Sequence, residues 1–443
     1  MSEQMKPKTV DWIGEVPSGW GIKRIKYLST LKGRIGWQGL TADEYTEEGP
    51  YLITGVDFNN GQIDWNNCVH ITEERWAEAP EIHIKNGDLL ITKDGTVGKV
   101  AIVADLTGKA SLNSGVLLIR TFEGYNKKFL YWVLQSDEFW TWFKLKNAGN
   151  STIIHLYQND FAEFSYTFPN EDEQQAIADY LDEQCNKIDG VICDLETQID
   201  ILQRYKKSLI LETVTKGLNK NVPMKPSGID WIGDIPKHWT SSKIKYNIEL
   251  IGSGTTPESG NPLYYEDGIY NWIQSGDLYK TDYIFSTEKQ LTQLALKDNP
   301  VLTYYEKDFV VIAMYGASVG NVSISKIDAY TNQACCVIKA KSDDDIRYIF
   351  YFLKAAQDEM LLKAFGGTQP NISQIIIKNL NFLKIPINEQ KAIAEYLDTR
   401  CAKIDTILQD KQAQLEIIKQ HKKSLIYEYV TGKKRVKENS NGN

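Results

Sequence analysis

The chain has 443 residues, of which 42% are hydrophobic and 24% are charged, and its net charge is −8. This length predicts two or three domains with cores of their own, and the composition excludes collagen-like, mucin-like and wholly disordered proteins. An acidic chain is also unlike a free-standing nucleic-acid binder, although residues 171–215 hold 11 acidic and 4 basic side chains and so carry most of the excess. No run approaches the ~20 apolar residues of a membrane span, and no signal peptide is evident, so we expect a cytoplasmic protein.

The elements in chain order predict an α+β protein of five segments. Residues 1–170 form a first mixed body, with strands near 88–92 and 116–120 and one amphipathic helix through Phe129, Trp132, Val133, Trp140 and Phe143. Residues 171–217 form a long helix. Residues 218–387 form a second mixed body, with strands near 309–312 and 336–339 and helical aromatic residues at Tyr348 and Phe352 followed by Leu361. A second long helix over 388–432 precedes a basic tail, 433–443, which we expect to be disordered.

The chain contains an internal repeat of one unit. The heptapeptide at residues 11–17, D-W-I-G-E-V-P, returns at residues 230–236 as D-W-I-G-D-I-P. The long helices also match, from Glu173-Gln174 and Glu389-Gln390 through K-K-S-L-I at 206–210 and 422–426. Between these ends the two bodies match only at isolated positions, such as Gly95 with Gly316. A repeated frame therefore carries two unlike bodies.

Both long helices show the alternating steps of three and four residues that mark a coiled-coil seam. The first seam is Leu181, Cys185, Ile188, Ile192, Leu195, Ile199 and Leu202, and the second is Leu397, Cys401, Ile404, Leu408, Leu415 and Ile418, interrupted by Lys411. Asp172 and Asn388 are candidate N-caps, and Gly217 and Gly432 occupy positions typical of helix C-termini. If the ends of the second body lie close together, the two helices run antiparallel, related by a pseudo-two-fold axis. The distal C-terminus then returns to the first body, and a partner that recognises the repeated surface binds as two copies.

Taken together, these residues resemble the specificity subunit of type I restriction-modification systems. The resemblance covers nearly the whole chain and rests on D-W-I-G-x-[IV]-P-x-x-W in both halves and on the helix start N-E-Q-K-A-I-A-E-Y-L-D at 388–398. It also includes the Gly95–Lys99 turn, and the run from Gly254 through Tyr265 that is followed by S-G-D-L at 275–278. The second copy of the turn, Gly316–Asn321, lacks the lysine.

The resemblance implies two target-recognition domains on an antiparallel helical spacer. Each domain would read one half of a bipartite, asymmetric DNA target, and the helices would set the spacing and dock two modification (methyltransferase) subunits. Those subunits would bring S-adenosylmethionine, and restriction subunits would bring ATP, Mg and cleavage. This chain itself would be non-catalytic, with no cofactor. Its six cysteines form no C-x-x-C pair and its five histidines no cluster, so the residues suggest neither a metal site nor a disulfide framework.

Polar loop residues are the candidates for DNA contact, because Arg, Asn and Gln suit base edges and Lys and Thr suit phosphates. In the first domain they are Lys32, Arg34, Trp37, Gln38, Lys93, Thr96, Lys99, Asn150, Ser151, Thr152 and His155. In the second domain they are Thr255, Thr256, Tyr264, Tyr315, Ser318, Asn321, Thr368, Gln369 and Asn371.

Two other interpretations compete with this one. Asn261-Pro262-Leu263-Tyr264 is similar to the N-P-P-Y motif of amino-methyltransferases, so the chain could be a self-contained adenine-N6 DNA methyltransferase. The glycine-rich loop that would bind S-adenosylmethionine is not evident, which favours a non-catalytic role. A coiled-coil scaffold without affinity for nucleic acid is the third hypothesis.

Overall fold

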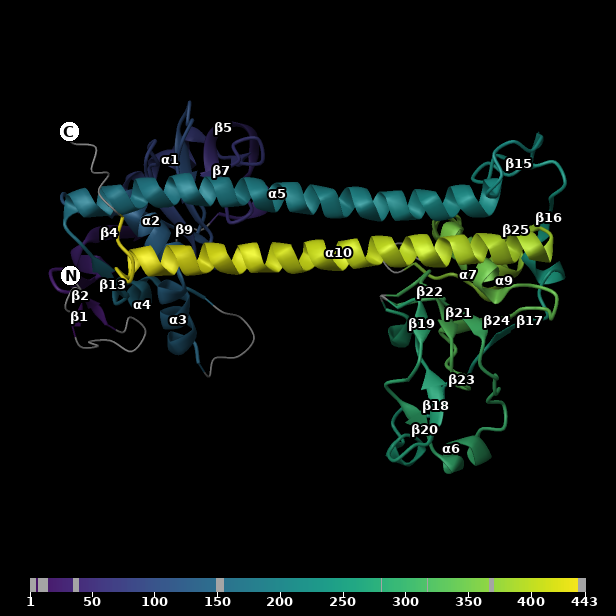
Figure 1. The fold of residues 1–443 in the computed structure, drawn as a ribbon. Helices are drawn as coiled ribbons and strands as arrows, with labels where there is room; N and C mark the ends of the chain where they lie inside the picture. Colours follow the sequence, from purple (N-terminus) through teal and green to yellow (C-terminus); the bar gives the residue numbers. More distant parts are fainter. Residues whose placement is uncertain are drawn as a thin grey trace. The chain divides into compact units, whose positions relative to one another are not determined.

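The computed structural model describes residues 5–6, 15–34, 40–148, 155–279, 281–316, 318–365 and 370–436. The chain divides into two compact units, Met1–Glu196 with Ala413–Asn443, and Thr197–Gln412. Each unit therefore combines one globular body with segments of both long helices (Figure 1). The two units are described in turn.

The first body is built on a four-stranded antiparallel sheet in the order β10-β9-β12-β4. Its strands are β4 (Ser29–Gly33), β9 (Leu89–Thr92), β10 (Val100–Ile102) and β12 (Val116–Thr121). Because side chains alternate along a strand, Leu89 and Ile91 face one core and Leu90 faces another. One face is covered by α2 (Lys127–Gln135) and α3 (Asp137–Lys146), and the other by a sheet of β11 (Ala110–Leu112), β5 (Thr46–Ile53) and β8 (Val69–His70).

Short elements complete the first body. They are β1 (Met5–Lys6), β2 (Val16–Pro17), β3 (Gly21–Arg24), β6 (Phe58–Asn59), β7 (Gln62–Ile63), β13 (Ser165–Phe168), α1 (Glu73–Ala77), α4 (Gln158–Ala162), and the 3-10 turns Ile25–Tyr27, Ala42–Glu44 and Pro80–Ile82. Strand β13 pairs antiparallel with β3, which brings the end of the body beside its beginning. The long helix that follows therefore starts next to the point where the chain enters the body.

The second body repeats this plan around a five-stranded sheet in the order β17-β24-β21-β22-β19, antiparallel except for the β19–β22 pair. Its strands are β17 (Leu250–Ser253), β19 (Tyr283–Ile284), β21 (Phe309–Ala313), β22 (Val322–Ser325) and β24 (Cys335–Lys339). Helices α7 (Ile346–Ala355) and α8 (Gln357–Leu362) contribute to the core on one side of this sheet. A small sheet of β20 (Gln290–Leu291), β18 (Tyr270–Ile273) and β23 (Tyr330–Thr331) belongs to the same body.

The remaining elements of the second unit are short. They are β14 (Met224–Pro226), β15 (Asp234–Pro236), β16 (Thr240–Lys243), β25 (Asn381–Lys384), α6 (Gln293–Asp298), α9 (Gln374–Lys378), and the 3-10 turns Ile244–Tyr246, Pro262–Tyr264 and Ser275–Leu278. Strand β25 pairs with β16 as β13 pairs with β3. Both bodies therefore close in the same way before a long helix begins.

The predicted amphipathic helix of the first body is two helices. Ser136 lies between α2 and α3 with φ −81° and ψ 161°, an extended conformation that ends one helix and precedes the next. Its amide and its hydroxyl both donate to the Val133 carbonyl, at 3.1 and 2.7 Å, which closes the C-terminus of α2. The second body is divided in the same way, with Tyr348 and Phe352 on α7 and Leu361 on α8.

The two long helices are α5 (Glu171–Lys216) and α10 (Ile387–Val430). The predicted N-caps are wrong. Asn170 caps α5, because its side chain accepts from the Glu173 amide at 2.9 Å, whereas Asp172 lies inside the first turn. Asn388 likewise lies inside α10, which begins after Pro386. The prediction for the C-termini is confirmed, since Gly217 and Gly432 have φ of 75° and 73°, the left-handed region that favours glycine.

Ion pairs show the direction of the helices. In the first unit Asp189 bonds Lys422 at 2.6 Å and Glu196 bonds Lys419 at 2.9 Å, so moving forward along α5 means moving back along α10. In the second unit Lys206 bonds both carboxylate oxygens of Asp405, at 2.7 and 2.8 Å. The antiparallel arrangement is confirmed, and with it the predicted fold class of two mixed bodies with two long antiparallel helices and an internal repeat.

Every predicted seam residue is buried or half-buried. Leu181, Cys185, Leu195, Leu397, Cys401 and Ile404 are buried, and Ile188, Ile192, Ile199, Leu202, Leu408, Leu415 and Ile418 are half-buried. Lys411, which interrupts the second seam, is half-buried as well. The helix segments thus pack along the stripe that their periodicity predicts.

The chain's C-terminal segment belongs to the first unit, as the repeat predicts. The Thr167 hydroxyl donates to the Val430 carbonyl at 2.8 Å, and Arg435 lies 3.4 Å from Glu173. Val436 packs against the first core. The expectation of a disordered tail is therefore wrong for residues 433–436, which these contacts hold, and residues 437–443 lie outside the described part of the chain.

Candidate nucleic-acid interface

The turn between β9 and β10 is a tight hairpin with two glycines in the left-handed region. Gly95 has φ 69° and Gly98 has φ 84°. The Gly98 amide donates to the Thr92 carbonyl at 2.9 Å, and the Lys99 amide donates to the Thr92 hydroxyl at 2.9 Å. A side chain at Gly98 would also overlap the Trp140 ring. This position therefore requires glycine both for its backbone and for its space.

Four of the predicted DNA-contact residues meet at this turn. Thr96 and Lys99 are exposed, and both donate to the Gly55 carbonyl, at 3.4 and 3.5 Å. Lys93 is half-buried, and its carbonyl accepts from the Leu156 amide at 2.9 Å. His155 is held there by a 2.5 Å contact between its Nδ1 and Asp94 Oδ1. Two ammonium groups and a hydroxyl at one exposed turn can bind phosphate oxygens.

A second turn beside the first was missed by the sequence reasoning. The Asp57 carboxylate accepts from the Thr54 amide at 2.7 Å and from the Thr54 hydroxyl at 2.9 Å, and burial raises the pKa of Asp57. This turn presents the Gly55 carbonyl to the turn between β9 and β10, which we call the lysine turn after Lys93 and Lys99. It leaves Val56 exposed. The second body has a similar turn, in which the Gln274 amide donates to Asp277 at 2.7 Å. The sequence signal that could have identified the turn is the aspartate that ends both T-G-V-D at 54–57 and Q-S-G-D at 274–277.

The turn between β21 and β22 has the same backbone frame with different side chains. The Gly320 amide donates to the Ala313 carbonyl at 2.8 Å, as Gly98 does to Thr92. The Ile372 amide donates to the Met314 carbonyl at 2.7 Å, as Leu156 does to Lys93. Gly316 and Gly320 have φ of 87° and 80°. The cationic positions of the first turn are thus replaced by apolar or neutral polar residues in the second.

The structure places the candidates of the second domain in different settings. Asn321 follows the turn and donates from Nδ2 to the Leu278 carbonyl at 3.2 Å, and Ser318 is buried. Tyr315 is half-buried, and burial raises its pKa. Asn371 is exposed and lies one residue before the Ile372 bond to the turn. These four residues therefore lie at or beside one turn.

Thr255, Thr256 and Tyr264 lie outside that turn. The two threonines are half-buried, and the Thr255 amide donates to the Thr331 carbonyl at 3.0 Å. The Tyr264 hydroxyl donates to Asp298 at 3.2 Å. Thr255 is thus tied to the end of β23 and Tyr264 to α6, whereas the four candidates described above lie at the turn between β21 and β22 or beside it.

Arg34 lies inside the first domain and does not reach its surface. Its side chain is 4% exposed, with Nε donating to the Leu112 carbonyl at 2.7 Å and a terminal nitrogen donating to the Ser111 hydroxyl at 2.9 Å. Lys32 is exposed on the edge strand β4. The remaining candidates, Trp37, Gln38, Asn150, Ser151, Thr152, Thr368 and Gln369, lie outside the described residues.

The methyltransferase-like motif forms a short capped turn. The Asn261 side-chain oxygen accepts from the Leu263 amide at 3.1 Å, and Leu263 is exposed. An asparagine that holds a target amine needs that oxygen for the substrate, whereas here it caps a 3-10 turn. Within the described ranges no group of His, Cys, Asp and Glu could hold a metal ion. No helix in that part of the chain is long and apolar enough to cross a membrane.

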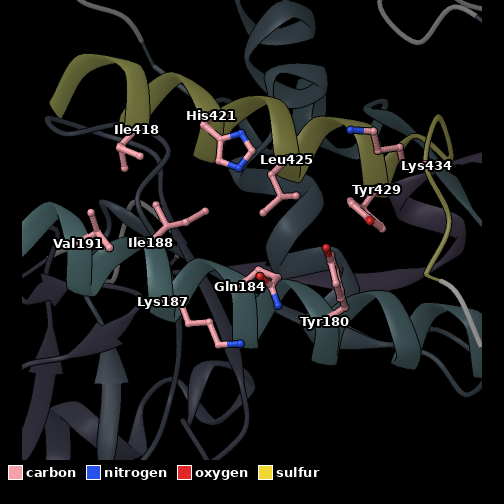
Figure 2. Close-up of a pocket in the computed structure, with 10 residues that line it drawn as sticks. All are labelled: Tyr180, Gln184, Lys187, Ile188, Val191, Ile418, His421, Leu425, Tyr429 and Lys434. Carbon is pink, nitrogen blue, oxygen red and sulfur yellow. The ribbon is translucent and has the colours of Figure 1, made fainter. Parts of the chain in front are cut away.

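A groove runs between α5 and α10 in the first unit (Figure 2). Tyr180 and Tyr429 face each other across it, with ring centroids 4.6 Å apart. The residues that line it are Tyr180, Gln184, Lys187, Ile188, Val191, Ile418, His421, Leu425, Tyr429 and Lys434. Most of the contact surface that it offers is aliphatic or aromatic, with cations at its rim.

Exposed aliphatic residues of the long helices occur at equivalent positions of the two copies. Val191 and Ile407, 216 positions apart in the sequence, are 46% and 44% exposed. Ile201 and Ile417, separated by the same interval, are 57% and 65% exposed. The first unit holds Val191 and Ile417, and the second holds Ile201 and Ile407. Apolar side chains are thus left in solvent at matching positions of the two copies.

Comparison with known proteins gives a consistent result. A family model described as the type I restriction modification DNA specificity domain matches residues 17–199 and again residues 236–417. The putative type I restriction enzyme MjaX specificity subunit of Methanocaldococcus jannaschii is 24% identical over 96% of each chain. The type I restriction enzyme EcoKI specificity subunit of Escherichia coli is 22% identical over 89% of this chain and 84% of its own.

A solved chain from work on complex assembly and conformational transition of the type I R-M system has the same fold. Its TM-score is 0.69 at 14% identity, over 94% of this chain and 98% of that one. The relatives from M. jannaschii and E. coli are named as specificity subunits, which recognise DNA and are not the catalytic subunits, so the methyltransferase hypothesis is not favoured. With one match to the family model for each copy of the repeat, the chain belongs to the type I restriction-modification DNA specificity family.

Proposed function

We propose that this chain is the specificity subunit of a cytoplasmic type I restriction-modification complex and that each body reads one half of a bipartite, asymmetric DNA target. The observation that carries the proposal is the pair of glycine turns with one backbone frame and different side chains. Lys93 and Lys99 stand where the second body has Met314 and Asn321. Two similarly built but chemically unlike surfaces are what recognition of two unlike half-sites requires.

The division of labour follows the five segments of the chain. Residues 1–170 and 218–387 would serve as the two recognition domains, and residues 171–217 and 388–432 as the spacer. The four residues at 433–436 would fasten the end of the chain to the first unit, through contacts such as that of Arg435 with Glu173. The length of the spacer would then set the number of base pairs between the half-sites, in the way that dimeric DNA-binding proteins fix the distance between theirs.

The exposed aliphatic residues of the long helices support the docking of two modification subunits. Val191 and Ile417, and likewise Ile407 and Ile201, give each unit an equivalent pair of exposed apolar side chains. Two copies of one partner can therefore use the same contacts. Those subunits would supply S-adenosylmethionine, and the restriction subunits ATP and Mg. Sharing the phosphate contacts with such partners would explain how a chain of net charge −8 binds DNA.

The test is to map modified bases across a genome in cells that carry the modification subunits with and without this chain. A bipartite motif with a fixed gap, present only with the chain, is the expected result. Lys93→Ala with Lys99→Ala should weaken modification at all sites by about ten-fold or more without changing the motif, because lysine–phosphate contacts carry affinity and not sequence. Asn321→Ala should relax one position in one half of the motif. Modification that does not depend on the chain would refute the proposal.

The spacer is tested by inserting four residues in α5 near residue 197. Four residues add about 6 Å and roughly one turn of helix, so the seam keeps its face. The expected motif keeps both halves and gains base pairs in the gap. An unchanged gap would show that the helices do not set the spacing.

A further inference from the structure

Each long helix holds its globular body through two polar side chains of the repeated frame. In the first unit, Gln174 Oε1 accepts from the Asn126 amide at 2.8 Å. Asp182 accepts from Trp132 Nε1 at 2.8 Å with one oxygen and from Lys128 Nζ at 2.8 Å with the other. All three donors lie at the start of α2 or on its first two turns, and Asn126 is the N-cap of that helix.

The second unit has the same arrangement. Gln390 Oε1 accepts from the amide of Asp345, the N-cap of α7, at 2.9 Å. Asp398 accepts from the Tyr351 hydroxyl at 2.8 Å and from an Arg347 terminal nitrogen at 2.9 Å. Both glutamines are buried, and each donates back to the chain just before its own helix, to the carbonyl of Pro169 or Ile385. Each glutamine side chain is therefore also held by a hydrogen bond to the chain segment that leads into its own helix.

The acceptors are identical in the two copies, whereas the donors are not. Gln174 and Asp182 correspond to Gln390 and Asp398 at an interval of 216 residues. The donors occupy equivalent positions of α2 and α7, namely the N-cap, the second residue after it and the sixth. At those positions the first body has Asn, Lys and Trp, and the second has Asp, Arg and Tyr. What the two bodies share is an amide, a cation and an aromatic N–H or O–H, that is, donor chemistry and not residue type.

These bonds give direction to a contact that is otherwise apolar. Leu181 and Cys185 of α5 share a core with Phe129 and Val133 of α2, and such packing stabilises without fixing one orientation. Hydrogen bonds weaken steeply when their angles change, so three of them within two helical turns fix both the position and the rotation of α2. Helix α2 in turn packs against β10, the strand that leaves the lysine turn. The direction in which that turn points is thereby tied to α5.

We propose that Gln174 with Asp182, and Gln390 with Asp398, form a socket that accepts any recognition domain with an N-cap amide, a cation and an aromatic donor at those three helix positions. Asp182 and Asp398 then act as positioning residues, which keep each DNA-reading turn at a fixed angle to the spacer. The inference rests on the proposed function, and its consequence is that the socket, together with the length of the helices, determines how strictly the gap in the target is read.

The first comparison exchanges donor types within the first unit. Lys128→Gln with Trp132→Phe removes the cation and the aromatic donor. Lys128→Arg with Trp132→Tyr replaces them with the donor types of the second body. Phe and Tyr at position 132 differ by one hydroxyl group, so the two variants remove nearly equal volume from the core. If Lys128 and Trp132 acted through packing alone, both variants would change the measured gap in the motif to the same extent.

The second comparison uses two tyrosines of α7. Tyr351→Phe removes the hydroxyl that donates to Asp398, and Tyr348→Phe removes one that donates to the Leu383 carbonyl at 3.3 Å within the body. Both side chains are buried and both changes delete one hydroxyl, but only Tyr351 belongs to the socket. Tyr348→Phe is therefore the matched control for general loss of a buried hydrogen bond.

The readout is the gap in the modified motif, measured with the full chain in its complex with the modification subunits. For Lys128→Gln with Trp132→Phe, and for Tyr351→Phe, modification of sites whose gap is one base pair longer or shorter should rise about ten-fold relative to the target, which corresponds to losing about 1.4 kcal/mol of discrimination. The half-site sequences should not change. The Arg and Tyr exchange and Tyr348→Phe should keep the strictness of the unaltered chain. Equal strictness in all variants, or equal loss in the matched pairs, would overturn the positioning role.

Amide hydrogen exchange tests the socket without DNA. In Lys128→Gln with Trp132→Phe, amides 126–129 should exchange about ten-fold faster, because the Asn126 bond to Gln174 loses its neighbours, and the Arg and Tyr exchange should restore protection. Unchanged protection in the first variant would overturn the socket. If the unaltered chain directs no bipartite modification, the proposed function fails and this measurement alone decides whether the socket exists.

Discussion

Glu138 gives the stability of the first unit a dependence on pH that can be measured. It lies in the first turn of α3 and is fully buried. Its Oε1 accepts from the Thr167 amide at 3.3 Å, and within the described residues its Oε2 has no hydrogen-bond partner. Burial without compensating donors raises the pKa of Glu138 from 4.5 to about 8. The carboxyl group is therefore neutral in the folded protein at pH 7.

The direction of the effect follows from which state holds the proton. Below pH 4.5 both the folded and the unfolded chain carry it, so Glu138 adds no penalty. As the pH rises from 4.5 to 8, the unfolded chain releases the proton while the folded chain keeps it, and the free energy of unfolding falls. Above pH 8 both states are ionised and the loss is complete. The difference between 4.5 and about 8 corresponds to a ceiling of about 5 kcal/mol, of which we expect roughly 2 to 5 kcal/mol to be observed.

The perturbation is Glu138→Gln, which keeps the shape and removes the titration. An unpaired amide donor costs the same at every pH, so the change in free energy between pH 5 and pH 8 isolates the proton. Urea unfolding followed by tryptophan fluorescence is suitable, because 8 of the 11 tryptophans lie in residues 1–170. The unaltered chain should lose about 2 to 4 kcal/mol more than the variant between these pH values. Parallel pH profiles of the two proteins would refute the reasoning.

Three further predictions concern the frame and the bodies. Lys206→Ala should lower the free energy of unfolding by about 1 kcal/mol. Most of that effect should disappear in 1 M salt, because the Asp405 carboxylate is partly exposed and salt screens the ion pair. An effect insensitive to salt would contradict an ion-pair origin. Gly254→Ala should destabilise the second unit by more than about 3 kcal/mol in thermal unfolding, because the new methyl group would overlap the Thr331 carbonyl. Gly260→Ala is the control, because a methyl group there would lie in open space. Ellman's reagent at pH 8 should modify one thiol per native chain, at the exposed Cys193. The other five thiols are buried, and burial raises their pKa values. Rapid reaction of several thiols would contradict their burial.

The frame could be predicted from the sequence because it is periodic and duplicated. Steps of three and four residues define one face of a helix, and two copies of that face have each other to pack against. The caps could not be predicted by residue type, since Asp172 and Asn170 both suit an N-cap and only the chain path selects Asn170. The break at Ser136 was missed for a similar reason, because the apolar pattern continues across it.

The candidate site was predicted in part. The pair Gly95 and Gly98 marks a turn that must adopt positive φ, and the neighbouring lysines follow directly from the sequence. Arg34 shows the limit of that reasoning, because the carbonyl that it binds lies at Leu112, 78 residues away. The socket was equally hidden, because the donors to Gln174 and Asp182 come from the divergent body, 48 to 54 residues earlier in the chain. Partners that meet only through the fold leave no local pattern.

The ion pairs between the long helices have a consequence for how such a chain can evolve. Each copy of the repeat contributes the acid to one pair and the base to the other, since Asp189 meets Lys422 while Lys206 meets Asp405. Exchange of genetic material between the copies therefore leaves both pairs intact, because donor and recipient carry the same residues at matching sites. A mutation confined to one copy weakens a single pair, and the other still holds the helices in register while a compensating change arises.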